Sequence, residues 1–105
     1  MGQFAVHRNS NPDTKAKVPY LLDVQSNLIG ELETRVVVPL YPAKSMKGRT
    51  VRNLMPSIDI EGKAFVMGTP EMAGIPKCAL GPVVADATHL RGEILSAIDF
   101  LLLGF

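Results

Sequence analysis

Cysteine, tryptophan, net charge and long apolar runs are all scarce in this 105-residue chain. The one cysteine, Cys78, has no partner for an internal disulfide, so the fold does not depend on an oxidising compartment. Eleven basic side chains against ten acidic ones leave a net charge of only +1. So small a charge argues against a protein that neutralises a run of nucleic-acid phosphates. We therefore expect no direct binding of the chain alone to nucleic acid.

Segments that target a chain to a membrane are missing as well. The longest apolar run, Phe100 to Phe105, has six residues, whereas a membrane helix needs about 20. The first residues carry neither the cationic start and apolar stretch of a secretion signal nor a myristoylation pattern. We expect a cytoplasmic chain with no membrane contact.

Residue groups typical of catalysis or metal binding are equally scarce. His7 and His89 stand alone, and no Gly-rich phosphate loop or nucleophile elbow is present. Cys78 has no histidine near it in the sequence, and we interpret it as a buried strand cysteine rather than a reactive thiol. We expect no catalytic residue, no metal site, no cofactor and no enzymatic activity.

The composition that is present favours one folded domain, residues 1–105. Hydrophobic residues make up 47% and charged residues 20%, which leaves no room for a large disordered segment. A second core would leave each half too small to bury enough apolar surface. Alternating and β-branched residues predict strands at 4–6, 20–24 and 34–40, with turn residues at 9–13. Pro39 indicates an edge, a bulge or a barrel corner.

The clearest β element is a hairpin over residues 57–67. Its turn is Glu61-Gly62, where glycine accepts the positive φ of a tight turn. Prolines and glycines between 70 and 82 then predict brief strands joined by loops.

The C-terminal segment instead predicts a helix. Its apolar residues recur at helical spacing: Leu90, Ile94, Ala97, Ile98 and Leu101. Thr88 is the expected N-cap and Gly104 the expected C-terminal stop. After Asp99 every side of the helix is apolar through Phe105. Such an end either packs in a homodimer interface or binds a partner, and the two interpretations are compatible.

Two charged features also suggest partners. Asp99 lies in the last helical turn, where the macrodipole disfavours an anion by about 0.3–1 kcal/mol. It is therefore solvated, paired within the chain, or directed at a cationic partner. Residues 1–53 carry a net charge of +4 and residues 54–105 carry −3, and no acidic residue lies between 41 and 53. The basic residues of that stretch are Lys44, Lys47, Arg49 and Arg52. They form either a solvated loop or a counter-surface for an acidic or disordered regulatory peptide.

Several strings along the chain share one further property, their order and spacing. They are Phe4, Asp23-Val24-Gln25-Ser26 with Leu28-Ile29, Val38-Pro39-Leu40, Pro56 with Ile60, Met72-Ala73 with Pro76, Gly81, Val84-Ala85-Asp86, Ala97-Ile98, and Gly104 before one large apolar residue. On these strings the whole chain resembles the CcdB family of bacterial toxin–antitoxin toxins.

The resemblance implies a mainly β fold. It is a homodimer of small SH3-like barrels of the CcdB and MazF type, each with a smaller inserted sheet and one C-terminal α-helix. It also implies a type II toxin that is not an enzyme. Such a toxin binds the DNA gyrase A subunit and traps gyrase on cleaved DNA, and a disordered segment of a CcdA-like antitoxin neutralises it.

The resemblance also assigns residues to these partners. The gyrase contacts would be Ser26, Leu28, Asp99, Leu102, Leu103, Gly104 and Phe105. The antitoxin would contact the basic residues Lys44, Lys47, Arg49 and Arg52.

Two positions depart from the family pattern. Leu103 stands where the best-known members have a tryptophan that stacks on a gyrase arginine, a contact typically worth about 0.5–2 kcal/mol. Asp99 replaces an asparagine, and its carboxylate could restore part of the loss through a charge-assisted bond to the same arginine. Two alternatives therefore stand beside the gyrase poison. One is an endoribonuclease toxin of the MazF and Kid kind on the same fold, and the other is an inactive homologue.

Overall fold

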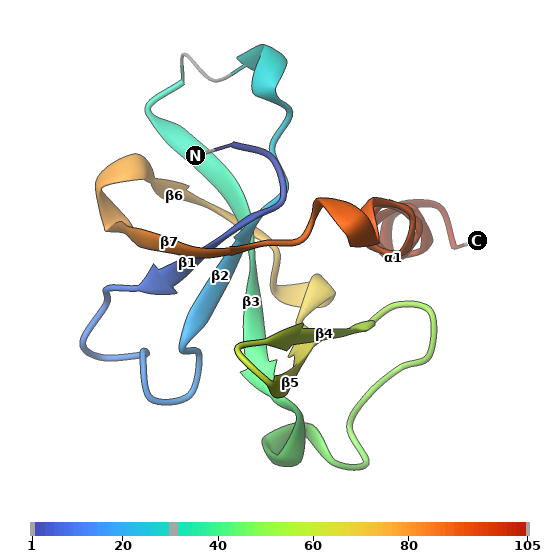
Figure 1. The fold of residues 1–105 in the computed structure, drawn as a ribbon. Coiled ribbons are helices and arrows are strands. Elements are labelled where there is room, and N and C mark those ends of the chain that lie inside the picture. The colour runs from blue at the N-terminus through green and yellow to red at the C-terminus, as the bar shows by residue number, and fades with distance from the viewer. Residues whose placement is uncertain (1, 30–31, 105) are drawn as a thin grey trace.

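The computed structural model describes residues 2–29 and 32–104, and it shows seven strands followed by one α-helix (Figure 1). The strands are β1 (Ala5–Asn9), β2 (Tyr20–Asp23), β3 (Thr34–Pro42), β4 (Ser57–Ile60), β5 (Lys63–Met67), β6 (Ala73–Pro76) and β7 (Leu80–Asp86), and the helix is α1 (Arg91–Leu103). Short 3-10 turns lie between them, including η1 (Asn27–Ile29), η2 (Ala43–Met46), η4 (Lys77–Ala79) and η5 (Thr88–Leu90). The predicted mainly β fold with one C-terminal helix is confirmed.

The strands form one curled antiparallel sheet in the order β4-β5-β3-β2-β1-β7. β3 pairs with β2 along one edge, while its other edge pairs with β6 over Thr34–Val37 and with β5 over Leu40–Pro42. The smaller inserted sheet that we expected is therefore a branch of the main sheet, joined to it through β3. Pro39 lies between the two pairings, where its carbonyl accepts the Gly68 N–H at 2.8 Å. This is the corner that the proline indicated.

The core lies on the concave face of the sheet and is closed by α1. Leu22, Val38 and Leu40 are fully buried there, as the alternation of side chains along β2 and β3 requires. Ile94 and Ala97 of α1 are also fully buried and belong to the same cluster. The helix face predicted from the apolar periodicity is thus the face that closes the half-barrel.

The predicted hairpin is formed by β4 and β5. Glu61 and Gly62 both have positive φ, 52° and 81°, which matches the right-handed twist of the two strands. The strands at 20–24 and 34–40 appear as β2 and β3 with small shifts at their ends. Phe4, however, precedes β1 with φ at 71° while its side chain is 3% exposed, so the first strand begins one residue later than predicted.

Two local predictions were wrong. Thr88 is not the N-cap of α1, because η5 comes first and Asp86 accepts bonds from the Thr88 N–H (3.0 Å) and hydroxyl (2.6 Å). The carboxylate two residues earlier outcompetes the threonine hydroxyl for this turn. Cys78 is exposed in η4 rather than buried in a strand, because β6 ends at Pro76 and β7 begins only at Leu80.

Candidate partner-binding surfaces

The end of α1 displays apolar side chains to solvent. The exposed fractions of Leu101, Leu102 and Leu103 are 36%, 66% and 62%, and Asp99 is exposed beside them. Gly104 ends the helix with φ at 82° and donates its N–H to the Phe100 carbonyl at 2.9 Å. This left-handed cap is the stop predicted from the sequence.

We name Asp99, Leu102, Leu103 and Gly104 the C-terminal tip. Phe105, which belongs to the same predicted contact, lies outside the described residues. Burying a leucine is worth about 1.5–3 kcal/mol relative to leaving it in water. Two adjacent, largely exposed leucines on the last helical turn therefore form a surface on which a partner gains free energy.

A second exposed apolar side chain lies in the connection between β2 and β3. Leu28 in η1 is 94% exposed, and its N–H donates to the Ser26 hydroxyl oxygen at 3.1 Å. Leu32, in the same connection, is 51% exposed. The side chain of Leu28 is thus presented on a short turn that Ser26 helps to shape.

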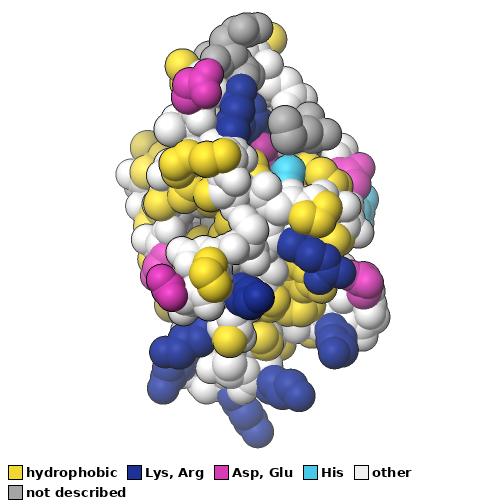
Figure 2. All heavy atoms as spheres, turned by 90° about the vertical axis from the view of Figure 1, so that its left-hand side faces the viewer, with side chains coloured by type: hydrophobic (Ala, Val, Ile, Leu, Met, Phe, Trp, Pro, Cys, Tyr) yellow, Lys and Arg dark blue, Asp and Glu magenta, His cyan; other side chains and the backbone are white. Residues whose placement is uncertain are grey.

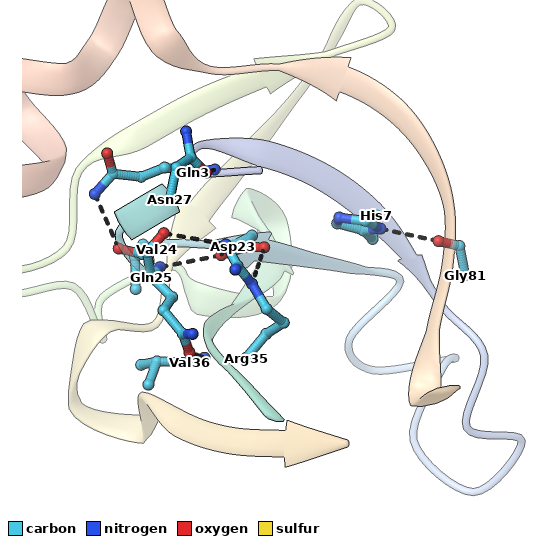
Figure 3. Close-up of polar contacts among 9 residues, drawn as sticks. All are labelled: Gln3, His7, Asp23, Val24, Gln25, Asn27, Arg35, Val36 and Gly81. Atoms are coloured by element: carbon cyan, nitrogen blue, oxygen red, sulfur yellow. Dashed lines mark hydrogen bonds and ion pairs between the residues drawn. The ribbon is translucent and has the colours of Figure 1, made fainter. Parts of the chain in front are cut away.

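The base of this connection is held by a buried ion pair, shown in Figure 3. Arg35 donates from Nε to Asp23 Oδ2 at 2.8 Å and from Nη2 to Asp23 Oδ1 at 3.0 Å. The two residues are 4% and 0% exposed. Such a bidentate pair is a strong and directional contact, because both partners are charged and planar.

Gln25 completes the network. Its N–H donates to Asp23 Oδ1 at 3.0 Å, its side-chain carbonyl accepts the Val36 N–H at 2.9 Å, and its main-chain carbonyl accepts from Arg35 Nη2 at 3.1 Å (Figure 3). The network therefore joins Asp23, the last residue of β2, to Arg35, the second residue of β3, across the two ends of the connection that carries Ser26. The sequence analysis did not predict this network. The signal for it was that Asp23 directly follows Leu21-Leu22 and Arg35 directly precedes Val36-Val37, so both charges lie in predicted strands.

Asn27 ties the same connection to the N-terminal segment. The Gln3 N–H donates to Asn27 Oδ1 at 2.8 Å, and the Gln3 side-chain amide donates to the Val24 carbonyl at 3.2 Å (Figure 3). The turn that carries Leu28 is thus supported from both sides.

The basic residues form a third surface. Lys44 lies in η2, and Lys47, Arg49 and Arg52 lie in the following connection to β4, where all four are exposed. Figure 2 shows Lys and Arg side chains gathered at the lower end of the molecule, the end formed by this connection in Figure 1, with no acidic side chain among them on that face. The excess of basic residues in the first half of the sequence is thus concentrated on one local surface.

The three surfaces do not merge within one chain. We name residues 47–56, between η2 and β4, the basic connection. In Figure 1 the turn with Ser26 and Leu28 is at the top, the C-terminal tip is at the right, and the basic connection is at the bottom. The structure therefore brings Ser26 to Leu28 and Asp99 to Leu102, Leu103 and Gly104. It does not bring the first pair to the tip.

A catalytic constellation does not emerge from the residues that the structure describes. No group of three or more histidine, cysteine or carboxylate side chains could hold a metal ion in this part of the chain. His7 is 1% exposed with Nδ1 at 2.9 Å from the Gly81 carbonyl oxygen, so that nitrogen carries the proton and donates it. Its Nε2 is buried and has no hydrogen-bond partner within 2–29 and 32–104. The sequence offered no signal for this burial.

Two side chains away from the three surfaces have perturbed ionisation. Burial raises the pKa of Tyr41, and the neighbouring Glu71, which accepts its hydroxyl at 3.2 Å, raises it further. The hydrogen bonds from Thr88 lower the pKa of Asp86. The lowered pKa of Asp86 reflects hydrogen bonds to its ionised carboxylate, whereas the raised pKa of Tyr41 favours the neutral phenol. Over residues 2–29 and 32–104, no helix is both long and apolar enough to cross a membrane.

The fold and the exposed surfaces together indicate the general class of protein. Within the described residues, the chain is a small β half-barrel whose one α-helix presents an apolar end to solvent, an arrangement suited to binding another macromolecule. A profile of the CcdB protein family matches residues 3–104, nearly the whole chain. The chain therefore belongs to the CcdB family. Membership implies a toxin of a toxin–antitoxin system.

Proposed function

We propose that the chain is a gyrase poison, a cytoplasmic toxin that binds the DNA gyrase A subunit and traps gyrase on cleaved DNA without being an enzyme. The observation that carries the proposal is the C-terminal tip, where Leu102 and Leu103 are 66% and 62% exposed on a capped helix. Membership of the CcdB family supports this choice of target.

The mechanism follows from rigidity and exposure. α1 is anchored in the core by Ile94 and Ala97, so its last turn projects the leucines with little freedom to lose on binding. Apolar contacts there hold gyrase in one conformation, and Asp99 offers a carboxylate to a cationic side chain of the target. A bound protein of this kind poisons by stabilising one intermediate of the gyrase cycle.

We place Ser26 and Leu28 in the same contact through a homodimer. The two groups are separate in one chain (Figure 1), so a single target surface reaches both only if it is extended or if two copies act together. A two-fold dimer repeats each surface and presents two tips to a dimeric target.

The neutralising partner in this proposal is a CcdA-like antitoxin with a disordered acidic segment. The exposed residues Lys44, Lys47, Arg49 and Arg52 supply the positive surface that such a segment requires. A disordered segment can wrap over the surface formed by these basic residues. A longer segment can also reach and cover the C-terminal tip.

The test is binding to the purified gyrase breakage-reunion domain, followed by a cleavage-complex assay. We expect the full chain to bind and to accumulate cleaved DNA. Deletion of Gly104 and Phe105 should abolish both effects while circular dichroism shows an unchanged fold. Val83→Ser is the matched control, because Val83 in β7 is 47% exposed and belongs to none of the three surfaces. Retained binding after the deletion would refute the proposal.

A further inference from the structure

A groove of about 580 Å³ lies beside the basic connection, where several strand ends meet. Tyr20 at the start of β2, Pro42 at the end of β3 and Phe65 in β5 line it. Lys44 of η2 and Lys63, the first residue of β5, also line it. The apolar residues come from three strands that are consecutive in the sheet, β2, β3 and β5.

The apolar wall of the groove is held in place by aromatic contacts. The Tyr20 and Phe65 rings meet edge to face, with centroids 5.0 Å apart and an interplanar angle of 82°. The guanidinium of Arg8 lies 5.8 Å from the Tyr20 centroid, and the Tyr20 hydroxyl donates to Glu61 Oε1 at 3.3 Å. Phe65 is 5% exposed, so it also closes the core. The wall is therefore rigid before any partner arrives.

The charges of the groove have one sign. Lys44 and Lys63 are exposed, and neither forms an ion pair with another of the described residues. The nearby carboxylate of Glu61 is already engaged by the Tyr20 hydroxyl and lies 3.9 Å from Arg8 Nη2. Lys44 also makes the groove continuous with the basic connection, and Figure 2 shows no acidic side chain at that lower end of the face.

We propose that this groove is an anchor site for an acidic peptide segment that carries one large apolar side chain. The apolar side chain packs against Tyr20, Pro42 and Phe65, and carboxylates on either side of it pair with Lys44 and Lys63. This inference rests on the proposed antitoxin contact and adds to it the anchor residue and a site outside the basic connection. Charge alone would make the contact weak and salt-sensitive, whereas a buried anchor adds affinity and direction.

A nucleic-acid strand fits the groove less well. Base recognition by stacking needs an open aromatic face, but the Tyr20 ring already has Arg8 over it and Phe65 beside it. The near-neutral net charge of the chain also gives little long-range attraction for phosphates.

The experiment uses the full chain and a short synthetic peptide of aspartate and glutamate with one central tryptophan. Isothermal titration at low salt measures its affinity. A matched peptide with alanine in place of tryptophan tests the anchor, and a single-stranded oligonucleotide tests the competing occupant. We expect the tryptophan peptide to bind at least several-fold more tightly than the alanine peptide and the oligonucleotide.

Two variants probe charge and shape separately. The double change Lys44→Glu and Lys63→Glu should weaken the tryptophan peptide by roughly tenfold at low salt. Ala64→Trp, at an exposed position that also lines the groove, should block the anchor without altering charge. Lys15→Glu with Arg91→Glu, at two exposed positions that do not line the groove, is the matched charge control and should leave binding unchanged.

The outcomes separate this site from the proposed function. If Arg49→Glu with Arg52→Glu weakens the peptide while the groove variants do not, the anchor site is refuted and the basic antitoxin surface stands. Equal affinity for the two peptides, stronger binding of the oligonucleotide, or a change of oligomeric state in the groove variants would each also overturn it. Binding of the groove variants to the gyrase domain should match that of the unchanged chain, since the tip is untouched.

Discussion

At the scale of single residues, one buried ion pair bears most on stability and one exposed leucine bears most on binding. Asp23 and Arg35 are charged side chains inside a small core, and they are tolerated because each satisfies the other and Gln25 completes the bonds. Leu103 is the reverse case, an apolar side chain that the fold leaves in water. The first supports a surface and the second forms one.

Removing one member of the ion pair should be far more harmful than removing both. We expect Arg35→Met to lower the free energy of unfolding by about 3–5 kcal/mol, because the Asp23 carboxylate is then buried without its partner. Adding Asp23→Leu should recover most of the loss. Urea unfolding of the two variants measures this, and simple additivity of the two single changes would contradict it.

The tip should gain affinity for the gyrase domain when it carries an aromatic side chain. We expect Leu103→Trp to strengthen binding to the gyrase domain by a few-fold to about thirtyfold, as a new cation–π contact of about 0.5–2 kcal/mol allows. Asp99→Asn in the chain with Leu103 unchanged should weaken binding, because it removes the carboxylate that the proposed contact offers to a cationic side chain of the target. Surface plasmon resonance decides both, and unchanged affinity for Asp99→Asn would remove the compensating role of that carboxylate.

At the scale of elements, α1 depends on how its two ends are stopped. Gly104 ends it through a positive φ that other residues adopt only with strain. At the start Asp86 accepts two bonds from Thr88 and orders η5 before the helix begins. Because the leucines of the tip lie at the far end, any fraying of α1 weakens the surface that they form.

The start of α1 should be sensitive to acid. The hydrogen bonds from Thr88 lower the pKa of Asp86 below its ordinary value of 3.8 in the folded chain, so the stabilisation is complete above that value. It is lost as pH falls through the lowered pKa. The unfolding free energy of the unchanged chain should therefore exceed that of Asp86→Ala at neutral pH, and the gap should close in strong acid. Asp13→Ala, in an exposed turn away from α1, is the control, and a gap independent of pH would contradict the role of Asp86.

At the scale of the whole molecule, the placement of the two apolar surfaces favours assembly. A single chain exposes two apolar surfaces at separate corners, and a dimer provides the simplest route for both to serve one target. The near-neutral net charge of the chain gives little long-range attraction for nucleic-acid phosphates.

We expect sedimentation equilibrium to give twice the 11.3 kDa of one chain at micromolar concentration. A monomer at these concentrations would oppose the homodimer. In a separate assay, purified protein incubated with total RNA should leave it intact. Sequence-specific cuts in that RNA would favour the endoribonuclease alternative instead.

The sequence by itself determined the features that depend on neighbours along the chain. The Glu61-Gly62 turn, the helical spacing from Leu90 and the apolar end after Asp99 follow from local conformational preference and periodicity. Only the tertiary structure decided which edge of β3 takes β5 and β6, that Asp23 meets Arg35, and that Cys78 is exposed. The physical reason is that each of these depends on contacts between segments far apart in the chain, whose pairing local preference does not specify.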